Sequence, residues 1–280
     1  MSLTTAIRAC LLLVVAVVAP PLEPEAKVWT FTEYRVVPVR VHLLRDTVTP
    51  AAATSLTTDD ITRIFKKANS IWHTAGVELR VESVVTEKPA GVGEYEHQAV
   101  LPIGALLALR PAETRPQGMF HVYYIGAMSP NGIFMRRDGI FVKESAALRK
   151  VPGGIDEPLP RVSAHELGHG MGLPHRQDTT NLMASGTTGT SLNAAEIEIV
   201  RQTLGRLTWV ETPEACHKAA DALFAAGKKA EALSRYRALL DLPVDRKLAA
   251  EIALKVRAGT LSDKQDVEGL LRGKASNAKP

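Results

Sequence analysis

The segment that most constrains this 280-residue chain is 165–175, which reads His-Glu-Leu-Gly-His-Gly-Met-Gly-Leu-Pro-His. Residues four apart on a helix share a face, so His165 and His169 are predicted to project side by side. Their imidazoles can then both reach one zinc ion at about 2.0–2.1 Å. Glu166 is adjacent, and its carboxylate can reach a metal-bound water without binding the metal itself. This placement predicts that Glu166 acts as a catalytic base.

The turn after the second histidine decides whether a third ligand can join. A residue six positions after His169 would point away from the metal if the helix simply continued. Gly172 readily adopts a positive φ and can end the helix, and Pro174 prevents the helix from resuming. His175 is then free to approach the metal from another side. Three nitrogen ligands and one water would form an open tetrahedral site, which is typical of catalytic rather than structural zinc.

The complete pattern is rare. A bare His-Glu-x-x-His arises by chance in about one sequence in a hundred at ordinary composition. Requiring Gly172 and His175 as well lowers that chance by a further factor on the order of a thousand. Each histidine taken singly would more often be an ordinary surface or core residue, but the set predicts a metal centre.

The extended motif, followed by a methionine turn, is the signature of metzincin zinc peptidases, and 165–175 resembles it at every specified position. Asn181-Leu-Met183-Ala resembles the methionine turn. The resemblance implies that Met183 lies beneath the metal as a hydrophobic floor and is not a ligand. It also implies a closing helix over 191–204, for which Leu192, Ala195, Ile199 and Leu204 supply the apolar positions. It is clear over about 160–205 and matches no single family within the clan.

The same resemblance implies a twisted sheet above a horizontal cleft, with an antiparallel edge strand that lines the cleft. Segment 131–143 is the candidate edge, and an extended substrate would pair with it by strand addition. Ala184 and Ser185 follow Met183, so the tyrosine that some metzincins carry two residues after this methionine is missing. A fifth ligand, from tyrosine, is therefore not expected.

The periodicity of apolar residues predicts the same general architecture. Val37, Val39, Val41 and Leu43 alternate in a half-buried strand. A helix with apolar positions from Ile61 to Trp72 follows, and Gly76 ends it. Further strands are predicted at 77–81, 119–126 and 139–143, before the helix of the motif. This order indicates an α/β (or α+β) fold, in which helices back a mixed sheet.

The N-terminus predicts export. Arg8 precedes an apolar run at 10–19, and prolines follow it. A helix of ten residues is about 15 Å long, half of a hydrocarbon core of about 30 Å, which favours a signal peptide over a membrane span. The alternative is an uncleaved signal that anchors the protein. The predicted organisation is a signal peptide and leader at 1–26, a peptidase domain at 27–211 and a helical segment at 212–280.

The C-terminal segment is rich in alanine and leucine over 219–242, and Gly227 divides it into two amphipathic halves. It resembles one tetratricopeptide unit at Ala220, Gly227, Ala232, Tyr236 and Pro243. Because one such unit cannot bury its own face, a helical hairpin packed on the catalytic domain is favoured over a separate module for a protein partner. Cys216, left alone once the signal peptide is removed, is predicted to be a structural thiol.

The charge distribution argues against nucleic-acid binding, and the spacing of the remaining histidines argues against a second metal site. The net charge of +4 is small and the basic residues are scattered, so nucleic acid is not an expected partner. His42, His73, His97, His121 and His217 show no ligand spacing, and core or surface positions are expected for them, although His121 could line the cleft.

The sequence therefore predicts a secreted or periplasmic zinc endopeptidase that hydrolyses peptide or protein substrates through a metal-activated water. One alternative is a zinc-retaining adaptor that acts through its C-terminal helices. Another is a zinc hydrolase that acts on a non-peptide bond.

Overall fold

The computed structural model describes residues 27–136 and 139–260. The predicted signal peptide at 1–26 and the end of the helical segment beyond residue 260 lie outside the described residues.

A five-stranded mixed sheet forms the centre of the fold. Its order is β2-β1-β3-β5-β4, and β4 is the only antiparallel strand in it. The strands are β1 (Arg35–Leu44), β2 (Val77–Glu87), β3 (Phe120–Ile125), β4 (Gly132–Phe134) and β5 (Ile140–Lys143). This arrangement confirms the predicted mixed α/β fold. The sequence predicted an edge segment at 131–143, and the short strand β4 forms only part of that segment.

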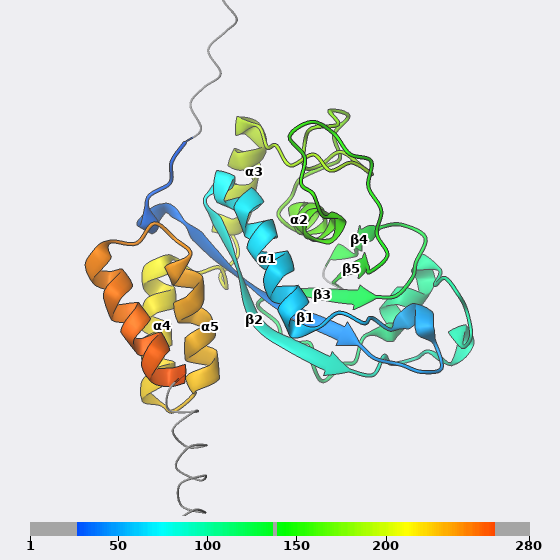
Figure 1. Cartoon of the computed structure of the whole chain (residues 1–280), viewed down its shortest axis with the longest axis horizontal. Helices are drawn as coiled ribbons and strands as arrows, with labels where there is room; N and C mark the ends of the chain where they lie inside the picture. The colour runs from blue at the N-terminus through cyan, green and yellow to red at the C-terminus, as the bar shows by residue number, and fades with distance from the viewer. Residues whose placement is uncertain (1–26, 137–138, 261–280) are drawn as a thin grey trace, which may run out of the picture.

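Helices cover one face of this sheet and short 3-10 segments cover the other. Helix α1 (Thr58–Trp72) and helix α2 (Pro158–Gly170) lie side by side on the first face (Figure 1). The second face packs on the 3-10 segments Pro50–Ala52 and Ile103–Leu109. Strand β1 is therefore buried on both faces, and its prediction as a half-buried strand was wrong. The reason is that a parallel strand in the middle of a sheet is covered on both sides.

Local signals set the bounds of α1 as the sequence predicted. The Thr57 hydroxyl accepts a hydrogen bond from the Asp60 N–H, and the Asp60 side chain reaches back to the Thr57 backbone, which forms a capping box. The apolar side of the helix is buried, including Ile61 and Trp72. Gly76, at a φ of +66°, turns the chain from the end of this helix into β2.

The closing helix, α3 (Ala194–Gly205), begins three residues later than predicted. Its N-cap is Asn193, whose side chain accepts a hydrogen bond from the Glu196 N–H. Of the predicted apolar positions, Leu192, Ile199 and Leu204 pack on the core, whereas Ala195 is exposed. The prediction did not include Glu196 and Val200, which are also buried. The buried Glu196 carboxylate accepts hydrogen bonds from Asn181 and Arg176, and these bonds fix the orientation of the helix.

Helices α4 (Pro213–Ala225) and α5 (Lys229–Leu240) form a hairpin against the start of the sheet (Figure 1). Their buried residues share a core with Trp29, Tyr34 and Val36. The Ser234 hydroxyl donates to the Val81 carbonyl at 2.6 Å, and Arg235 pairs with Glu211 at 2.5 Å. Residues 246–260 form a further helix beside the hairpin. These contacts favour a hairpin that is part of the folded unit.

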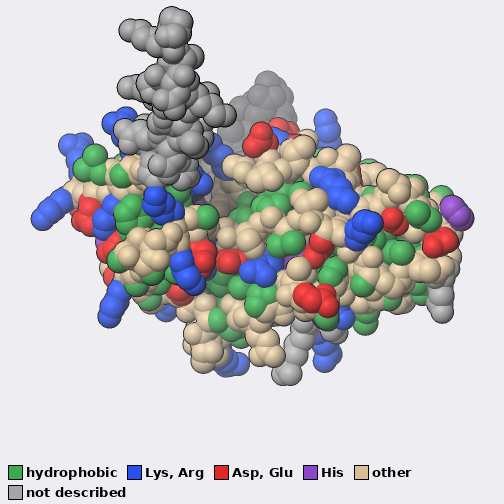
Figure 2. All heavy atoms as spheres, turned by 90° about the horizontal axis from the view of Figure 1, so that it is seen from below, with side chains coloured by type: hydrophobic (Ala, Val, Ile, Leu, Met, Phe, Trp, Pro, Cys, Tyr) green, Lys and Arg blue, Asp and Glu red, His purple; other side chains and the backbone are tan. Residues whose placement is uncertain are grey.

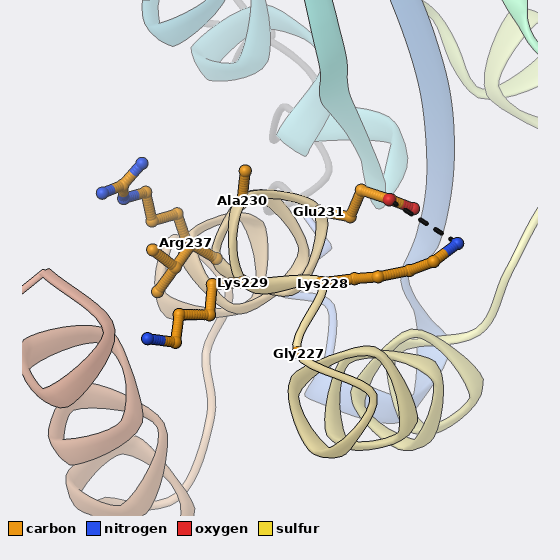
Figure 3. A pocket seen from close by; sticks show the side chains of 7 residues that line it. Gly227, Lys228, Lys229, Ala230, Glu231 and Arg237 are labelled. Carbon is orange, nitrogen blue, oxygen red and sulfur yellow. Dashed lines mark ion pairs between the residues drawn. The ribbon is translucent and has the colours of Figure 1, made fainter. Parts of the chain in front are cut away.

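The turn of this hairpin carries a shallow cavity with no metal-binding character. Gly227 adopts a φ of +76°, and Lys228 lies 3.8 Å from Glu231 (Figure 3). Lys229 and Arg237 point away from that ion pair. None of the described residues that line this cavity is a histidine or a cysteine.

Cys216 lies in α4 and is fully buried. Burial raises the pKa of its thiol to about 11. In a chain carrying Cys10→Ser, we expect a thiol reagent at pH 8 to label the native protein about a hundred-fold more slowly than the urea-unfolded protein, because the native thiol is both covered and protonated. Rapid, complete labelling of the native protein would contradict the structural role predicted for this residue.

The surface carries no concentrated charge on the face seen in Figure 2, where Lys and Arg side chains are interspersed with Asp and Glu. Among the described residues, no helix combines the length and the apolar character needed to cross a membrane.

Candidate metal centre

The structure brings His165, His169 and His175 together. Their ligand nitrogens all lie within 4.8 Å of one another, and the Nε2 atoms of His169 and His175 are 3.1 Å apart. Two nitrogens bound tetrahedrally to zinc at 2.0–2.1 Å would be separated by about 3.3 Å. The distance between these two nitrogens is therefore close to that expected for two ligands of the same ion. Ligation of one ion explains this distance without a hydrogen bond between the two rings.

Backbone carbonyls fix which nitrogen of each ring faces the centre. Nδ1 of His165 lies 2.8 Å from the Leu182 carbonyl oxygen, and Nδ1 of His169 lies 2.7 Å from that of Leu173. A carbonyl can only accept, so each Nδ1 carries the proton and each Nε2 keeps its lone pair. Burial also lowers the pKa of His165 to about 3 and lowers that of His169. Both rings are therefore neutral at physiological pH, as metal ligation requires.

The third histidine is positioned by a turn at the end of α2. The N–H of Leu173 donates to the Gly168 carbonyl at 2.9 Å, and that of Gly172 donates to the His169 carbonyl at 3.0 Å. These two bonds form a Schellman motif, whose residue after the C-cap takes the left-handed conformation. Gly172 has a φ of +95°, so the predicted role of this glycine in reversing the chain before His175 agrees with the backbone.

We expect Gly172→Val to lower zinc content well below one equivalent. A β-branched residue resists the positive φ, and a Cβ at this position would lie 2.8 Å from Thr203 Oγ1. The matched control is Gly227→Val, because Gly227 also has a positive φ, of +76°, but lies in the hairpin turn with open space around it. The control should lose some stability and keep its zinc. Metal analysis that finds one full equivalent in Gly172→Val would contradict the role of the turn.

Glu166 lies next to the three imidazoles and is almost fully buried, with 6% of the residue exposed. Its Oε1 is 4.0 Å from Nε2 of His165. Burial raises the pKa of the Glu166 carboxyl to about 8, while the Arg161 guanidinium and a hydrogen bond from the Phe134 backbone N–H act in the opposite direction. A divalent cation held by the histidines would favour the carboxylate further. Both the position and the pKa suit a group that exchanges a proton near neutral pH.

Arg161 is a residue of the site that the sequence reading missed. It is 2% exposed, and Nη1 lies 3.3 Å from Nδ1 of His165. Its guanidinium donates to the carbonyls of Ala184 and Gly189, so it holds the loop after the methionine turn against α2. The sequence could have indicated this role, because Arg161 lies four residues before His165, on the helix face that the motif requires to be buried.

Met183 is fully buried against the underside of α2. A Cβ at Gly168 would lie 2.7 Å from its Sδ, so the missing side chain at Gly168 provides the space for this methionine. The Met183 N–H donates to the Asn181 side chain at 2.7 Å, and its carbonyl accepts from the Arg176 N–H at 2.9 Å. Met183 is therefore tied to the segment that carries His175.

Strand β4 presents an open edge beside Glu166. The bonds from Met135 N to Gly139 O and from Lys143 N to Asn131 O show which residues face β5. By alternation, the backbone groups of Gly132 and Phe134 face the open edge. A Cβ at Gly132 would lie 2.6 Å from Glu166 Oε1, so only glycine lets the strand approach the carboxylate this closely.

The other described histidines lie outside the group formed by the motif, and His121 lines a cavity. His42 is fully buried and lies 2.6 Å from Glu87 and 2.9 Å from His121. His73 lies 2.6 Å from Glu78. Within residues 27–136 and 139–260, no other group of three His, Cys, Asp or Glu side chains brings its ligand atoms as close together as the motif does.

No family model matches this sequence, and no curated protein matches it. Among solved structures, the chain is similar to the crystal structure of metalloproteinase-II from Bacteroides fragilis, with a TM-score of 0.39 and 14% identity. The match covers 62% of this chain and 54% of that one, so the chain spans about half the length of this neighbour. A likeness at this level carries no argument about mechanism. The chemistry assigned to this chain therefore comes from the geometry of the three histidines and Glu166.

Proposed function

We propose that this chain is a zinc-dependent endopeptidase of the metzincin type that acts outside the cytoplasm. The observation that carries the proposal is the convergence of three imidazoles beside one buried carboxyl, next to an open strand edge. A structural site would close the metal with a fourth protein ligand, whereas this donor set leaves one position for water. The proposed export rests on the apolar run at 10–19, which lies outside the described residues.

Each group of residues in the site has a separate role in peptide hydrolysis. A zinc ion held at Nε2 of the three histidines supplies Lewis-acid polarisation of a carbonyl and lowers the pKa of a coordinated water. Glu166 accepts the proton of the attacking water on its carboxylate and passes it to the leaving amine nitrogen. The open edge of β4 aligns an extended peptide through the backbone of Gly132 and the carbonyl of Phe134, because the Phe134 N–H already donates to Glu166. This pairing places a backbone carbonyl of the peptide beside Glu166. Burial of Glu166 excludes bulk water from the path of the proton.

The adaptor alternative finds less support in the packing of the C-terminal helices. The buried face of the α4–α5 hairpin is already occupied by Trp29, Tyr34 and Val36. An adaptor would need that face, or another apolar face of the hairpin, to be free for a protein partner.

The proposal is tested by incubating the purified zinc-loaded protein with a peptide mixture derived from a proteome, with and without a chelator. We expect new peptide termini inside the substrate sequences, their loss with chelator and their return when zinc is restored. Cleavage that persists after complete removal of metal, or no cleavage of any peptide, would contradict the proposal. Hydrolysis of ester or amide substrates alone would favour the non-peptide hydrolase.

A further inference from the structure

A cavity of about 690 Å³ lies at the end of α2. Gly170, Phe120, Phe134 and Trp209 are among its lining residues. A Cβ at Gly170 would lie 2.8 Å from the Phe120 ring and 3.4 Å from the Phe134 ring, so both rings pack over this glycine. Phe120 and Trp209 meet edge to face, with ring centroids 5.2 Å apart. The part of the cavity next to Gly170 is therefore lined by aromatic rings.

The cavity is placed where a bound peptide would pass. Glu166 and Gly170 are four residues apart on α2, so the cavity begins about one helical turn, or roughly 5.4 Å, beyond the base. Along the open edge, Gly132 meets Glu166 and Phe134 meets Gly170. Two residues of extended chain span about 6.8 Å. A peptide paired with β4 would therefore carry a side chain into the cavity a few residues from the bond being cut.

Positively charged side chains also line the cavity. Among its described lining residues are Arg115 and Arg136, and none of them is acidic. Nε of Arg115 donates to the Pro111 carbonyl at 3.0 Å, and among the described residues Arg115 forms no ion pair with a carboxylate. His121 also lines the cavity, and its pKa is lowered by burial and then by Arg40, Arg115 and Arg110. The charge there comes from arginine at neutral pH.

We propose that this cavity is a specificity subsite that binds a carboxylate of the peptide substrate, with Arg115 as its main partner. The inference rests on the proposed function and names the substrate class that the site prefers. A guanidinium binds a carboxylate through two parallel N–H bonds, and the aromatic rings cover the aliphatic stem of the residue that carries it. Glutamate is expected to fit better than aspartate, because its longer aliphatic stem can pack on the rings while its carboxylate reaches Arg115.

The test compares peptides that differ only by glutamate or glutamine at each position around a cleaved bond. We expect glutamate at one fixed position to raise kcat/KM roughly ten-fold over glutamine, equivalent to about 1.4 kcal/mol. Arg115→Gln should bring this ratio close to one, and Arg115→Glu should favour a lysine there. Arg237→Gln is the matched control, because Arg237 is an exposed arginine on α5 that lines a different cavity, at the turn of the hairpin (Figure 3). The control should keep the ten-fold ratio.

Two further arms identify the source of the carboxylate and provide a readout besides turnover. Amidation of the peptide C-terminus should leave the glutamate-over-glutamine ratio and both rates unchanged, because a side chain is bound. If amidation instead lowered kcat/KM equally for both peptides, the terminal carboxylate would be the bound group, which would overturn the side-chain subsite. The zinc-loaded Glu166→Gln protein should bind the glutamate peptide about ten-fold more tightly than the glutamine peptide in calorimetry.

The outcomes separate the two proposals. Cleavage with equal rates on both peptides, or a preference that Arg115→Gln leaves intact, would overturn the subsite and leave the peptidase standing. Absence of cleavage of every peptide overturns the peptidase, and equal binding of both peptides to the Glu166→Gln protein then overturns the subsite as well.

Discussion

Replacing Glu166 with glutamine should lower kcat/KM on a cleavable peptide by about a hundred- to ten-thousand-fold while zinc content stays near one equivalent. The amide keeps the size of the side chain but cannot accept the proton of the attacking water. The metal should remain, because the ligand nitrogens belong to the three histidines and are oriented by the Leu182 and Leu173 carbonyls. Rates measured at substrate concentrations well below KM, together with metal analysis of the same sample, check both parts. Glu166→Ala should give the same pattern.

The matched control is Glu157→Gln, which changes the same residue type at the start of the same helix. Glu157 forms ion pairs with Arg63 and Lys67 on the surface and lies outside the metal centre. We expect this variant to retain wild-type turnover within about two-fold, since exposed ion pairs contribute little stability. Wild-type rates in Glu166→Gln would show that the assigned proton transfer is wrong.

Ending the chain after Glu211 should destabilise the whole fold. The truncation uncovers Trp29, Tyr34 and Val36, which are at most 7% exposed in the intact chain. Each contributes roughly 1.5–3 kcal/mol when fully buried. We therefore expect the free energy of unfolding to fall by about 5 kcal/mol or more, which is most of the stability of an ordinary domain. Denaturant unfolding followed by circular dichroism measures this loss.

The control for truncation is a chain that ends after Thr260, because it keeps every described contact of the hairpin. This chain should unfold at the denaturant concentration of the full-length protein. If instead the chain ending at 211 folded with full stability and full zinc content, the helical hairpin would be a separate module. That result would revive the adaptor alternative.

The parts of the site that could be predicted are those that depend on local chain geometry. The helix carrying His165 and His169, the turn at Gly172 and the approach of His175 follow from spacing within eleven residues. A helical face and a glycine with positive φ are properties of a short segment. The alternating strands and the capped helix α1 could be predicted for the same reason.

The parts that could not be predicted arise where distant segments meet. Gly132 is an ordinary loop residue in the sequence, and its role becomes visible only when β4 lies against Glu166. Arg161 interrupts an apolar helix face, but its carbonyl partners come from residues about twenty to thirty positions later. The burial of Glu196 in α3 could not be predicted from the apolar pattern of that helix. The partners of this residue, Arg176 and Asn181, lie in another segment.

The central claim is that three imidazoles converge on one divalent ion, and zinc-edge anomalous diffraction from crystals of the zinc-loaded protein tests it most directly. The account predicts one strong peak about 2.0–2.1 Å from Nε2 of His165, His169 and His175, with a single further ligand that does not come from the protein. A peak that lies beyond bonding distance of His175, or one bound by a fourth protein side chain, would contradict it.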